Sequence, residues 1–190
     1  MRNKAIFFDK DGVLNIDKGI IGTFEDVEFY PGIEDVLAYC RQKGYKIFVV
    51  TNQPIVARGI IKEIELKTIL DDFKKSLQKL NTEAKIDKIY YCPHHPNADI
   101  EKYRKKCSCR KPKPGMLLKA KKEYDIDLSA SYMIGDRPSD ITAGNLALCK
   151  TIQVLSGKHD DKMIETDLIL DNDIKPDFVI SSILELREVL

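Results

Sequence analysis

Acidic and hydroxyl side chains follow three short apolar runs of this sequence, in an arrangement that suits phosphoryl transfer. The three groups are Asp9-Lys10-Asp11-Gly12, Thr51-Asn52-Gln53, and Gly135-Asp136-Arg137 with Asp140 one helical turn later. A D-x-D-G sequence by itself is also typical of a solvated turn. Three groups that each come directly after an apolar run are harder to explain as turns, and they predict one shared crevice.

Paired carboxylates at this spacing are suited to covalent catalysis. One carboxylate can attack phosphorus and form an aspartyl-phosphate, and a second, two residues away, can protonate the leaving oxygen and then deprotonate water. Clustered carboxylates repel one another and the substrate, so an oxygen-only ligand set of this kind calls for Mg²⁺. The charge on the transferring phosphoryl group also needs a hydroxyl donor and a cation, for which Thr51 and Lys111 are the candidates.

Apolar runs alternate with helical patterns along the chain. The runs that predict buried strands are 5–8, 46–50, 88–91, 132–134, 151–155 and 178–180. Apolar residues at helical spacing predict helices within 33–40, 66–80, 116–124, 139–148 and 183–190. This alternation predicts an α/β fold, a Rossmann-like parallel sheet with helices on both faces. In such sheets the ligand lies beyond the carboxyl ends of the strands, where the acidic groups stand.

Four soft metal ligands stand close together in the middle of the chain. They are a C-x-H pair, Cys92 and His94, and a C-x-C pair, Cys107 and Cys109. Three thiolates and one imidazole make a closed, structural zinc site, in a loop over residues 92–110. The alternatives are free thiols in a reducing cytosol, or His95 in place of His94. We favour His94 because C-x-H mirrors C-x-C.

The composition excludes several classes of protein. The chain has 190 residues, a net charge of +1 and mixed signs throughout, which gives no reason to expect nucleic acid or a membrane surface as partner. The amino-terminal residues do not resemble a signal peptide, and no apolar run approaches a membrane span. An odd number of Cys, five, disfavours disulfides, and Cys40 and Cys149 are expected in the core. We expect a cytoplasmic monomer with one domain over 1–190.

The acidic motifs resemble the four motifs of the haloacid dehalogenase-like superfamily. The matching residues are Asp9-x-Asp11-Gly12, Thr51-Asn52, Lys111 and Gly135-Asp136-x-x-x-Asp140. The resemblance implies that Asp9 is the nucleophile and Asp11 the general acid/base. It implies that Asp9, the backbone carbonyl of Asp11 and Asp136 hold Mg²⁺. Asp140 would act through water or by orienting Asp136, and Thr51 and Lys111 would stabilise the phosphoryl group.

A wider set of motifs resembles one phosphatase family, the D-glycero-D-manno-heptose 1,7-bisphosphate 7-phosphatases, which share a subfamily with histidinol-phosphate phosphatases. These motifs are TNQ…ARG, YYCPHHP, C-x-CRKP-x-PGM and SYMIGD. The resemblance implies removal of the 7-phosphate of a small phosphorylated sugar, on the route to nucleotide-activated heptose for lipopolysaccharide or other surface glycans. It also implies the zinc ligands given above. The residues it implies at the substrate are Asp9, Lys10, Asp11, Asp17, Lys18, Gly19, Ile20, Thr51, Asn52, Gln53, Pro54, Arg110, Lys111 and Arg137.

The sequence departs from that family at two positions. Pro54-Ile55 replaces the usual Ser-Gly after TNQ, and Pro has no N–H to offer a phosphate. Arg137 stands where the family usually has Lys. The segment between Asp11 and the first helical pattern is short, which leaves no room for a large cap domain.

Two alternative functions remain open from the sequence. One is a histidinol-phosphate or broad sugar-phosphate phosphatase, although Arg110 would repel the cationic end of histidinol and would bind a second phosphate instead. The other is a zinc-bound interaction module on an inactive phosphatase fold. Such a module would be expected to lack Asp9 or Asp11, and both residues are present.

Overall fold

Six parallel strands form one sheet, in the order β3-β2-β1-β4-β5-β6. The computed structural model describes residues 2–157 and 175–190, so Met1 and residues 158–174 of the expected domain lie outside the described residues. The strands are β1 (Ala5–Phe8), β2 (Lys46–Asn52), β3 (Lys88–Cys92), β4 (Tyr132–Gly135), β5 (Lys150–Val154) and β6 (Phe178–Ile180). The helices are α1 (Ile33–Gln42), α2 (Glu63–Leu80), α3 (Gly115–Tyr124), α4 (Pro138–Leu146) and α5 (Leu186–Val189).

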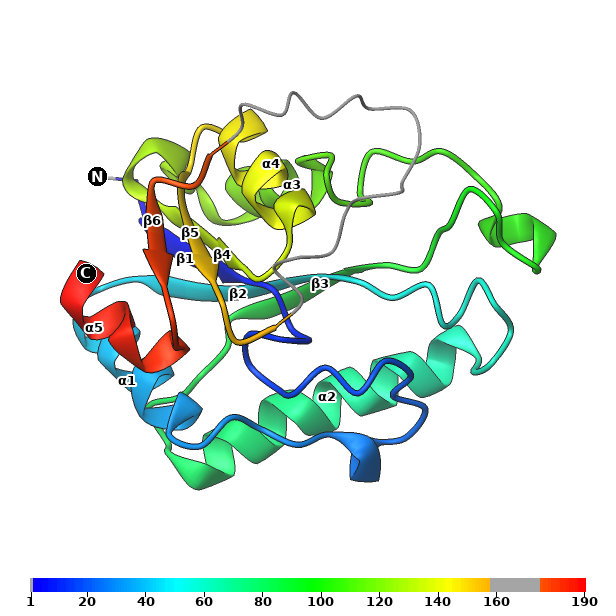
Figure 1. The fold of residues 1–190 in the computed structure, drawn as a ribbon, viewed down its shortest axis with the longest axis horizontal. Coiled ribbons are helices and arrows are strands. Elements are labelled where there is room, and N and C mark those ends of the chain that lie inside the picture. Colours follow the sequence, from blue (N-terminus) through cyan, green and yellow to red (C-terminus); the bar gives the residue numbers. More distant parts are fainter. Residues whose placement is uncertain (1, 158–174) are drawn as a thin grey trace.

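The helices cover both faces of the sheet, which confirms the predicted fold class. Figure 1 shows α3 and α4 on one face and α1, α2 and α5 on the other. Alternate residues of β1 point to opposite faces of the sheet. Ile6 and Phe8 pack on the face covered by α1, α2 and α5, whereas Ala5 and Phe7 pack on the face covered by α3 and α4. Because β1 is covered on both faces, all four of its residues are buried, and its sequence is an uninterrupted apolar run.

A third, smaller apolar cluster supports the loop that follows β3. Ile55 and Val56 pack there with Leu66 of α2 and with Ala98 and Tyr103 of the loop. Tyr103 ends a short 3-10 turn, Glu101–Tyr103. This cluster gives the long loop an apolar base beyond the sheet edge.

Element boundaries differ from the sequence prediction mainly at strand ends. β2 continues to Asn52 and β3 to Cys92, so these polar residues close the strands instead of following them. The closing helix is shorter than predicted, because a 3-10 turn over Ile183–Glu185 precedes α5. Between β1 and α1 the chain carries a single 3-10 turn, Phe24–Asp26, so the described residues include no cap domain. None of the helices described is long and apolar enough to cross a membrane.

Candidate active site

The acidic groups meet at the carboxyl edge of the three central strands. β1 lies between β2 and β4, and the backbone N–H of Asp9 donates to the carbonyl of Ile134 at 2.8 Å. The chain adds β2 and β3 on one side of β1 and the later strands on the other side. Open parallel sheets bind their ligands at the position where the chain changes sides in this way. The sheet therefore brings together side chains that are far apart in the sequence.

Three buried carboxylates converge at this edge. Asp9, Asp136 and Asp140 each offer an oxygen, and the three oxygens lie within 4.8 Å of one another. Asp9 is 7% exposed, and Asp136 and Asp140 are fully buried. Burial of this much negative charge is costly unless cations compensate it.

Lys111 supplies one of these cations. Its Nζ lies 2.8 Å from Asp9 Oδ1 and 2.6 Å from Asp140 Oδ1, and it donates to the carbonyl of Val50 at 2.8 Å. The side chain is 2% exposed. The ammonium is therefore fixed beside Asp9, and its action on a phosphoryl group stays a prediction.

Asn52 holds the backbone of Lys111 in place. Its Oδ1 accepts from the Lys111 N–H at 3.1 Å, and its Nδ2 donates to the Lys111 carbonyl at 3.0 Å. The sequence prediction placed Asn52 at the substrate. In the structure its amide joins the end of β2 to the segment that carries Lys111, 59 residues further along the chain.

The electrostatics of Asp9 fit a divalent cation. Burial raises the pKa of the Asp9 carboxyl to about 8; Lys111 counteracts this, while repulsion from Asp140 and Asp136 adds to it. A nucleophilic carboxylate must be ionised, so one buried ammonium beside three carboxylates leaves the site short of positive charge. Oxygen ligands at this spacing suit Mg²⁺, with Asp9 and Asp136 as the side chains that would hold it.

Asp11 is held by amides and a lysine. Its Oδ1 accepts from Asn15 Nδ2 at 2.9 Å and pairs with the Lys10 ammonium, while its Oδ2 accepts from Gln53 Nε2 at 3.1 Å. The same Gln53 nitrogen donates to Thr51 Oγ1 at 3.0 Å, so Gln53 links Asp11 to Thr51, both of which the sequence analysis placed at the substrate. The sequence analysis placed Lys10 at the substrate through the family resemblance and missed Asn15, which is fully buried. The single local signal for Asn15 was its position in the turn after D-x-D-G.

The glycine of the first motif is required by a close approach. Gly12 has φ +86°, and a Cβ at this position would lie 2.5 Å from Asp136 Oδ2. A side chain at residue 12 would therefore be strained and would displace the carboxylate of Asp136. The D-x-D-G turn and the motif after β4 are thus packed directly against each other.

Several of the predicted substrate residues lie around this cluster. Arg137 Nη2 pairs with Asp17 Oδ2 at 3.0 Å, and Asp17 Oδ1 accepts from the N–H of Gly19 at 2.8 Å. Lys18 pairs instead with Glu28 at 2.9 Å, and Ile20 is 57% exposed. The carbonyl oxygen of Pro54 accepts a hydrogen bond from the backbone N–H of Arg58 at 3.0 Å, so Pro54 begins a turn. Contact of these side chains with substrate stays a prediction.

Asp140 has two roles in the geometry. Besides the ion pair with Lys111, its Oδ2 accepts from the backbone N–H of Arg137 at 3.0 Å, at the start of α4. An added Cβ on Gly135 would lie 2.1 Å from Asp140 Cβ, so that glycine is also required by a close contact. The resemblance implied action through water or on Asp136. The structure shows Asp140 contacting Lys111 and the α4 amino terminus.

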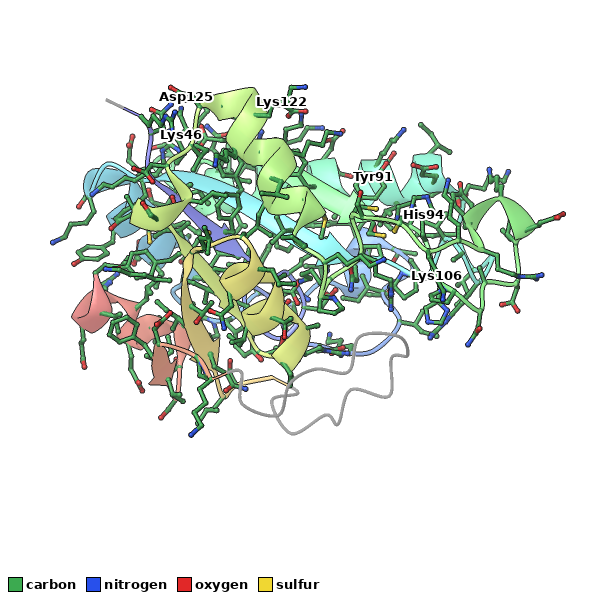
Figure 2. The ribbon with its side chains drawn as sticks, turned by 90° about the horizontal axis from the view of Figure 1, so that it is seen from above. Lys46, Tyr91, His94, Lys106, Lys122 and Asp125 are labelled. Carbon is green, nitrogen blue, oxygen red and sulfur yellow. The ribbon has the colours of Figure 1, made fainter. Side chains whose placement is uncertain are left out.

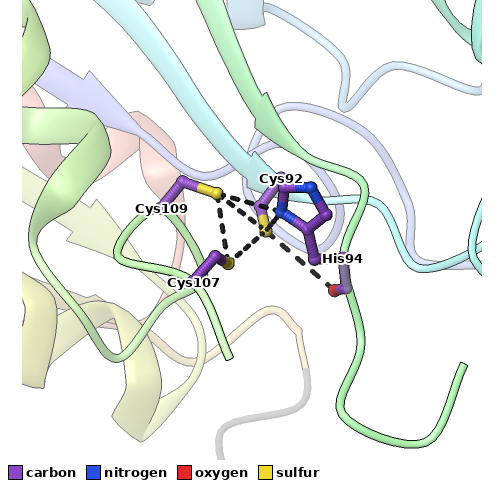
Figure 3. A group of neighbouring side chains, drawn as sticks. All are labelled: Cys92, His94, Cys107 and Cys109. Carbon is purple, nitrogen blue, oxygen red and sulfur yellow. Dashed lines mark hydrogen bonds between the residues drawn. The ribbon is translucent and has the colours of Figure 1, made fainter. Parts of the chain in front are cut away.

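The four soft ligands form a compact cluster beside the active site (Figure 3). Cys109 Sγ lies 3.2 Å from both Cys92 Sγ and Cys107 Sγ, and 3.4 Å from His94 Nδ1. A tetrahedral zinc with Zn–S bonds of about 2.3 Å gives edges of about 3.8 Å, so the cluster fits this ion. His95 is engaged differently, since its Nδ1 accepts from the N–H of Asn97 at 3.1 Å. The geometry therefore favours His94.

Glu63 anchors the loop that carries this cluster. Its two carboxylate oxygens accept from the hydroxyls of Tyr91 and Tyr103, each at 2.9 Å. Figure 2 shows Tyr91 and His94 at the end of the molecule opposite Lys46 and Asp125, which lie near the amino-terminal edge of the sheet. The loop is thus tied to α2 on the same side as the catalytic edge.

Removal of two thiols should abolish zinc binding without removing the catalytic carboxylates. We expect the Cys107→Ser/Cys109→Ser variant to lose its one equivalent of zinc and to show a lower thermal midpoint. The physical reason is the loss of two of four ligands from a closed site. Metal analysis after dialysis measures this, with Cys149→Ala, a buried thiol outside the cluster, as the control that keeps its zinc. Full zinc content in the double variant would contradict the ligand set.

The parallel sheet, the acidic groups at its carboxyl edge and the buried lysine define a haloacid dehalogenase-like phosphatase. A HAD-hydrolase-like family model matches residues 108–186. The D-glycero-beta-D-manno-heptose-1,7-bisphosphate 7-phosphatase of Photorhabdus laumondii is 43% identical over 155 residues, which are 81% of each chain. The D-glycero-alpha-D-manno-heptose-1,7-bisphosphate 7-phosphatase of Campylobacter jejuni is 45% identical and covers 76% of this chain and 77% of its own.

A solved structure agrees with these relatives. The D,D-heptose 1,7-bisphosphate phosphatase from B. bronchiseptica, solved with magnesium and phosphate, superimposes with a TM-score of 0.79 at 27% identity, covering 98% of this chain and 97% of its own. The chain belongs to the heptose-1,7-bisphosphate 7-phosphatase family of haloacid dehalogenase-like hydrolases, and it is a phosphoric monoester hydrolase.

Proposed function

We propose that the protein removes the 7-phosphate of D-glycero-D-manno-heptose 1,7-bisphosphate and leaves heptose 1-phosphate, in the cytoplasm, for nucleotide-activated heptose synthesis. The names of its relatives support this substrate. The observation that carries the proposal is the divergence of two neighbouring cations. Lys111 points into the carboxylate cluster, whereas Arg110 Nη1 donates to the carbonyl of His94 at 3.3 Å, beside the metal-ligand cluster.

The reaction proceeds in two displacements at phosphorus. A carboxylate oxygen of Asp9 attacks the 7-phosphate, the bond from phosphorus to the sugar oxygen breaks, and Asp11 gives its proton to that oxygen. Asp11 then takes a proton from water, whose oxygen attacks the aspartyl-phosphate, and inorganic phosphate and the Asp9 carboxylate are released. The amides of Asn15 and Gln53 hold the carboxylate of Asp11 during both proton transfers.

Several groups stabilise the charge of the transferring phosphoryl group. Lys111 Nζ and the hydroxyl of Thr51 donate to its oxygens, and the fixed position of Lys111 avoids reorganisation during the reaction. Asp9, Asp136 and the backbone carbonyl of Asp11 would hold Mg²⁺, which when bound offsets the carboxylate charge and polarises the phosphoryl group. Asp140 orients Lys111 through its ion pair.

The second phosphate of the substrate needs its own cation. Arg110 extends from the residue before Lys111, and the metal-ligand cluster fixes the chain on its amino-terminal side at Cys109. A guanidinium is well matched to a phosphate because it donates two parallel hydrogen bonds. Arg110 would therefore bind the anomeric phosphate while the 7-phosphate lies at Asp9.

The Arg110→Ala variant tests this assignment. We expect kcat/KM for the heptose bisphosphate to fall about ten- to a hundred-fold, since one charge-assisted contact of about 1.5–3 kcal/mol is lost. A sugar monophosphate should be hydrolysed almost as before. Steady-state kinetics with both anomers of the bisphosphate, a heptose 7-phosphate and histidinol phosphate would measure this. Arg2→Ala, whose side chain is 64% exposed and lies just before β1, is the matched control.

Equal losses on bisphosphate and monophosphate would remove Arg110 from the remote phosphate site. A preference of the wild-type enzyme for histidinol phosphate over both bisphosphate anomers would contradict the proposed substrate itself.

A further inference from the structure

The chain after β5 returns to the catalytic edge and contacts the first motif. Ser156 Oγ donates to the carbonyl of Gly12 at 3.1 Å, and the hydroxyl of Tyr30 donates to the carbonyl of Ser156 at 3.1 Å. The segment Ser156-Gly157 is thus tied to the D-x-D-G turn and to the residues that precede α1. No motif of the sequence analysis includes either residue.

Gly157 lies directly against the carboxylate of Asp136. A Cβ at this position would lie 2.2 Å from Asp136 Oδ2, 2.6 Å from its Cγ and 2.7 Å from its Cβ. At Gly12 the corresponding distances to Oδ2 and Cγ are 2.5 Å and 2.8 Å. Two glycines, Gly12 and Gly157, therefore lie against the carboxylate of Asp136, and neither leaves space for a methyl group.

We infer that Ser156 and Gly157 are positioning residues for the magnesium site. Gly157 sets the position of the Asp136 carboxylate by direct contact, and Ser156 holds Gly157 against the D-x-D-G turn through its hydrogen bond to Gly12. The inference rests on the magnesium site of the proposed function. Mg²⁺ requires nearly ideal octahedral geometry at short distances, so a small shift of one ligand weakens binding strongly.

Substitution of the glycine adds one methyl group at this contact. We expect Gly157→Ala to raise the Kd for Mg²⁺ about tenfold or more, the usual consequence of a disturbed outer contact to a metal ligand. Isothermal titration of the zinc-loaded protein with Mg²⁺, and Mn²⁺ binding followed by electron paramagnetic resonance, both measure this without substrate. The matched control is Gly22→Ala, because an added Cβ at residue 22 has nothing within 4 Å.

A positioning role differs from a purely structural one in two measured quantities. The zinc content of the Gly157→Ala protein should match the wild type, while the rise in its thermal midpoint on adding Mg²⁺, measured from its own magnesium-free midpoint, should shrink. The Ser156→Ala variant adds no volume and loses the hydrogen bond to Gly12, so it should raise the Mg²⁺ Kd by about threefold.

The outcomes decide between the possibilities. A wild-type Mg²⁺ Kd in Gly157→Ala would overturn the inference. If that variant does not fold, the Ser156→Ala variant decides, and a wild-type Kd there overturns it equally. Neither result depends on which sugar phosphate is hydrolysed, so failure of the heptose substrate would leave these measurements interpretable.

Discussion

The Asp9→Asn variant is expected to lose turnover by about four orders of magnitude or more, because an amide oxygen is too weak a nucleophile to form the covalent intermediate. The fold should survive, since Asn has the shape of the protonated carboxyl group. Phosphate release from the heptose bisphosphate at saturating Mg²⁺ measures the loss. Asp125→Asn is the control: its side chain is 76% exposed, and its φ of 49° is one that Asn tolerates.

The same variant carries a stability prediction whose sign follows from the pKa of Asp9. Burial raises this pKa from 3.8 to about 8, so the magnesium-free native state binds more protons than the unfolded state between those values. Stability of the magnesium-free wild type should therefore fall as pH rises from about 4 to about 8. Asn at residue 9 does not ionise, so Asp9→Asn should be at least as stable as the wild type at pH 8.

Differential scanning calorimetry at pH 5 and pH 8, with a chelator of Mg²⁺, measures both predictions on the same samples. Appreciable magnesium-dependent phosphate release by Asp9→Asn would remove Asp9 from the nucleophile role. A magnesium-free variant that is much less stable than the wild type at pH 8 would show that the ionised carboxylate stabilises the site.

The sequence was sufficient to predict that the acidic groups meet at one edge of the sheet, and the reason is topological. Asp9 and Asp136 each follow a short apolar run, and the carboxyl ends of parallel strands lie at one edge. The strand order was not predicted from the sequence, because apolar runs that are buried on both faces carry no signal of which strand lies beside which. The boundary of β2 at Asn52 was also missed, since Thr51 and Asn52 are polar residues inside the strand.

The contacts that hold the catalytic groups were harder to predict, because they join distant segments. Nothing in the local pattern around Asn52 indicates that its amide binds the backbone of Lys111, and nothing near Gly157 indicates contact with Asp136. Lys10 resembles an ordinary turn residue in sequence, yet it is 2% exposed beside the ring of Phe73. The choice between His94 and His95 likewise required the fold, which brings the His94 ring nitrogen within the cluster of three sulfurs.

Loss of the Lys111 ammonium is expected to damage both catalysis and stability. In Lys111→Met the transition state loses a fixed cation, so kcat should fall about a hundred- to a thousand-fold for bisphosphate and monophosphate alike. The buried carboxyl groups of Asp9 and Asp140 would also lose the ammonium that pairs with them, and this loss costs about 3–5 kcal/mol of folding free energy. Kinetics on both substrates and chemical denaturation of the magnesium-free protein measure the two effects.

The pH dependence separates this electrostatic role from simple packing. Burial lowers the pKa of Lys111, but attraction from Asp140 and Asp9 outweighs it and leaves the pKa raised. The ammonium therefore stays charged throughout neutral pH, and its ion pair with Asp140 stabilises the wild type until pH rises through that raised value. Without Lys111 the carboxylates can take up protons in acid, so the penalty of Lys111→Met should be smaller at pH 5 than at pH 8. Lys122→Met, at an exposed position of α3, should change neither kcat nor stability. A penalty independent of pH, or a loss of kcat confined to the bisphosphate, would show that Lys111 acts through packing or at the remote phosphate instead.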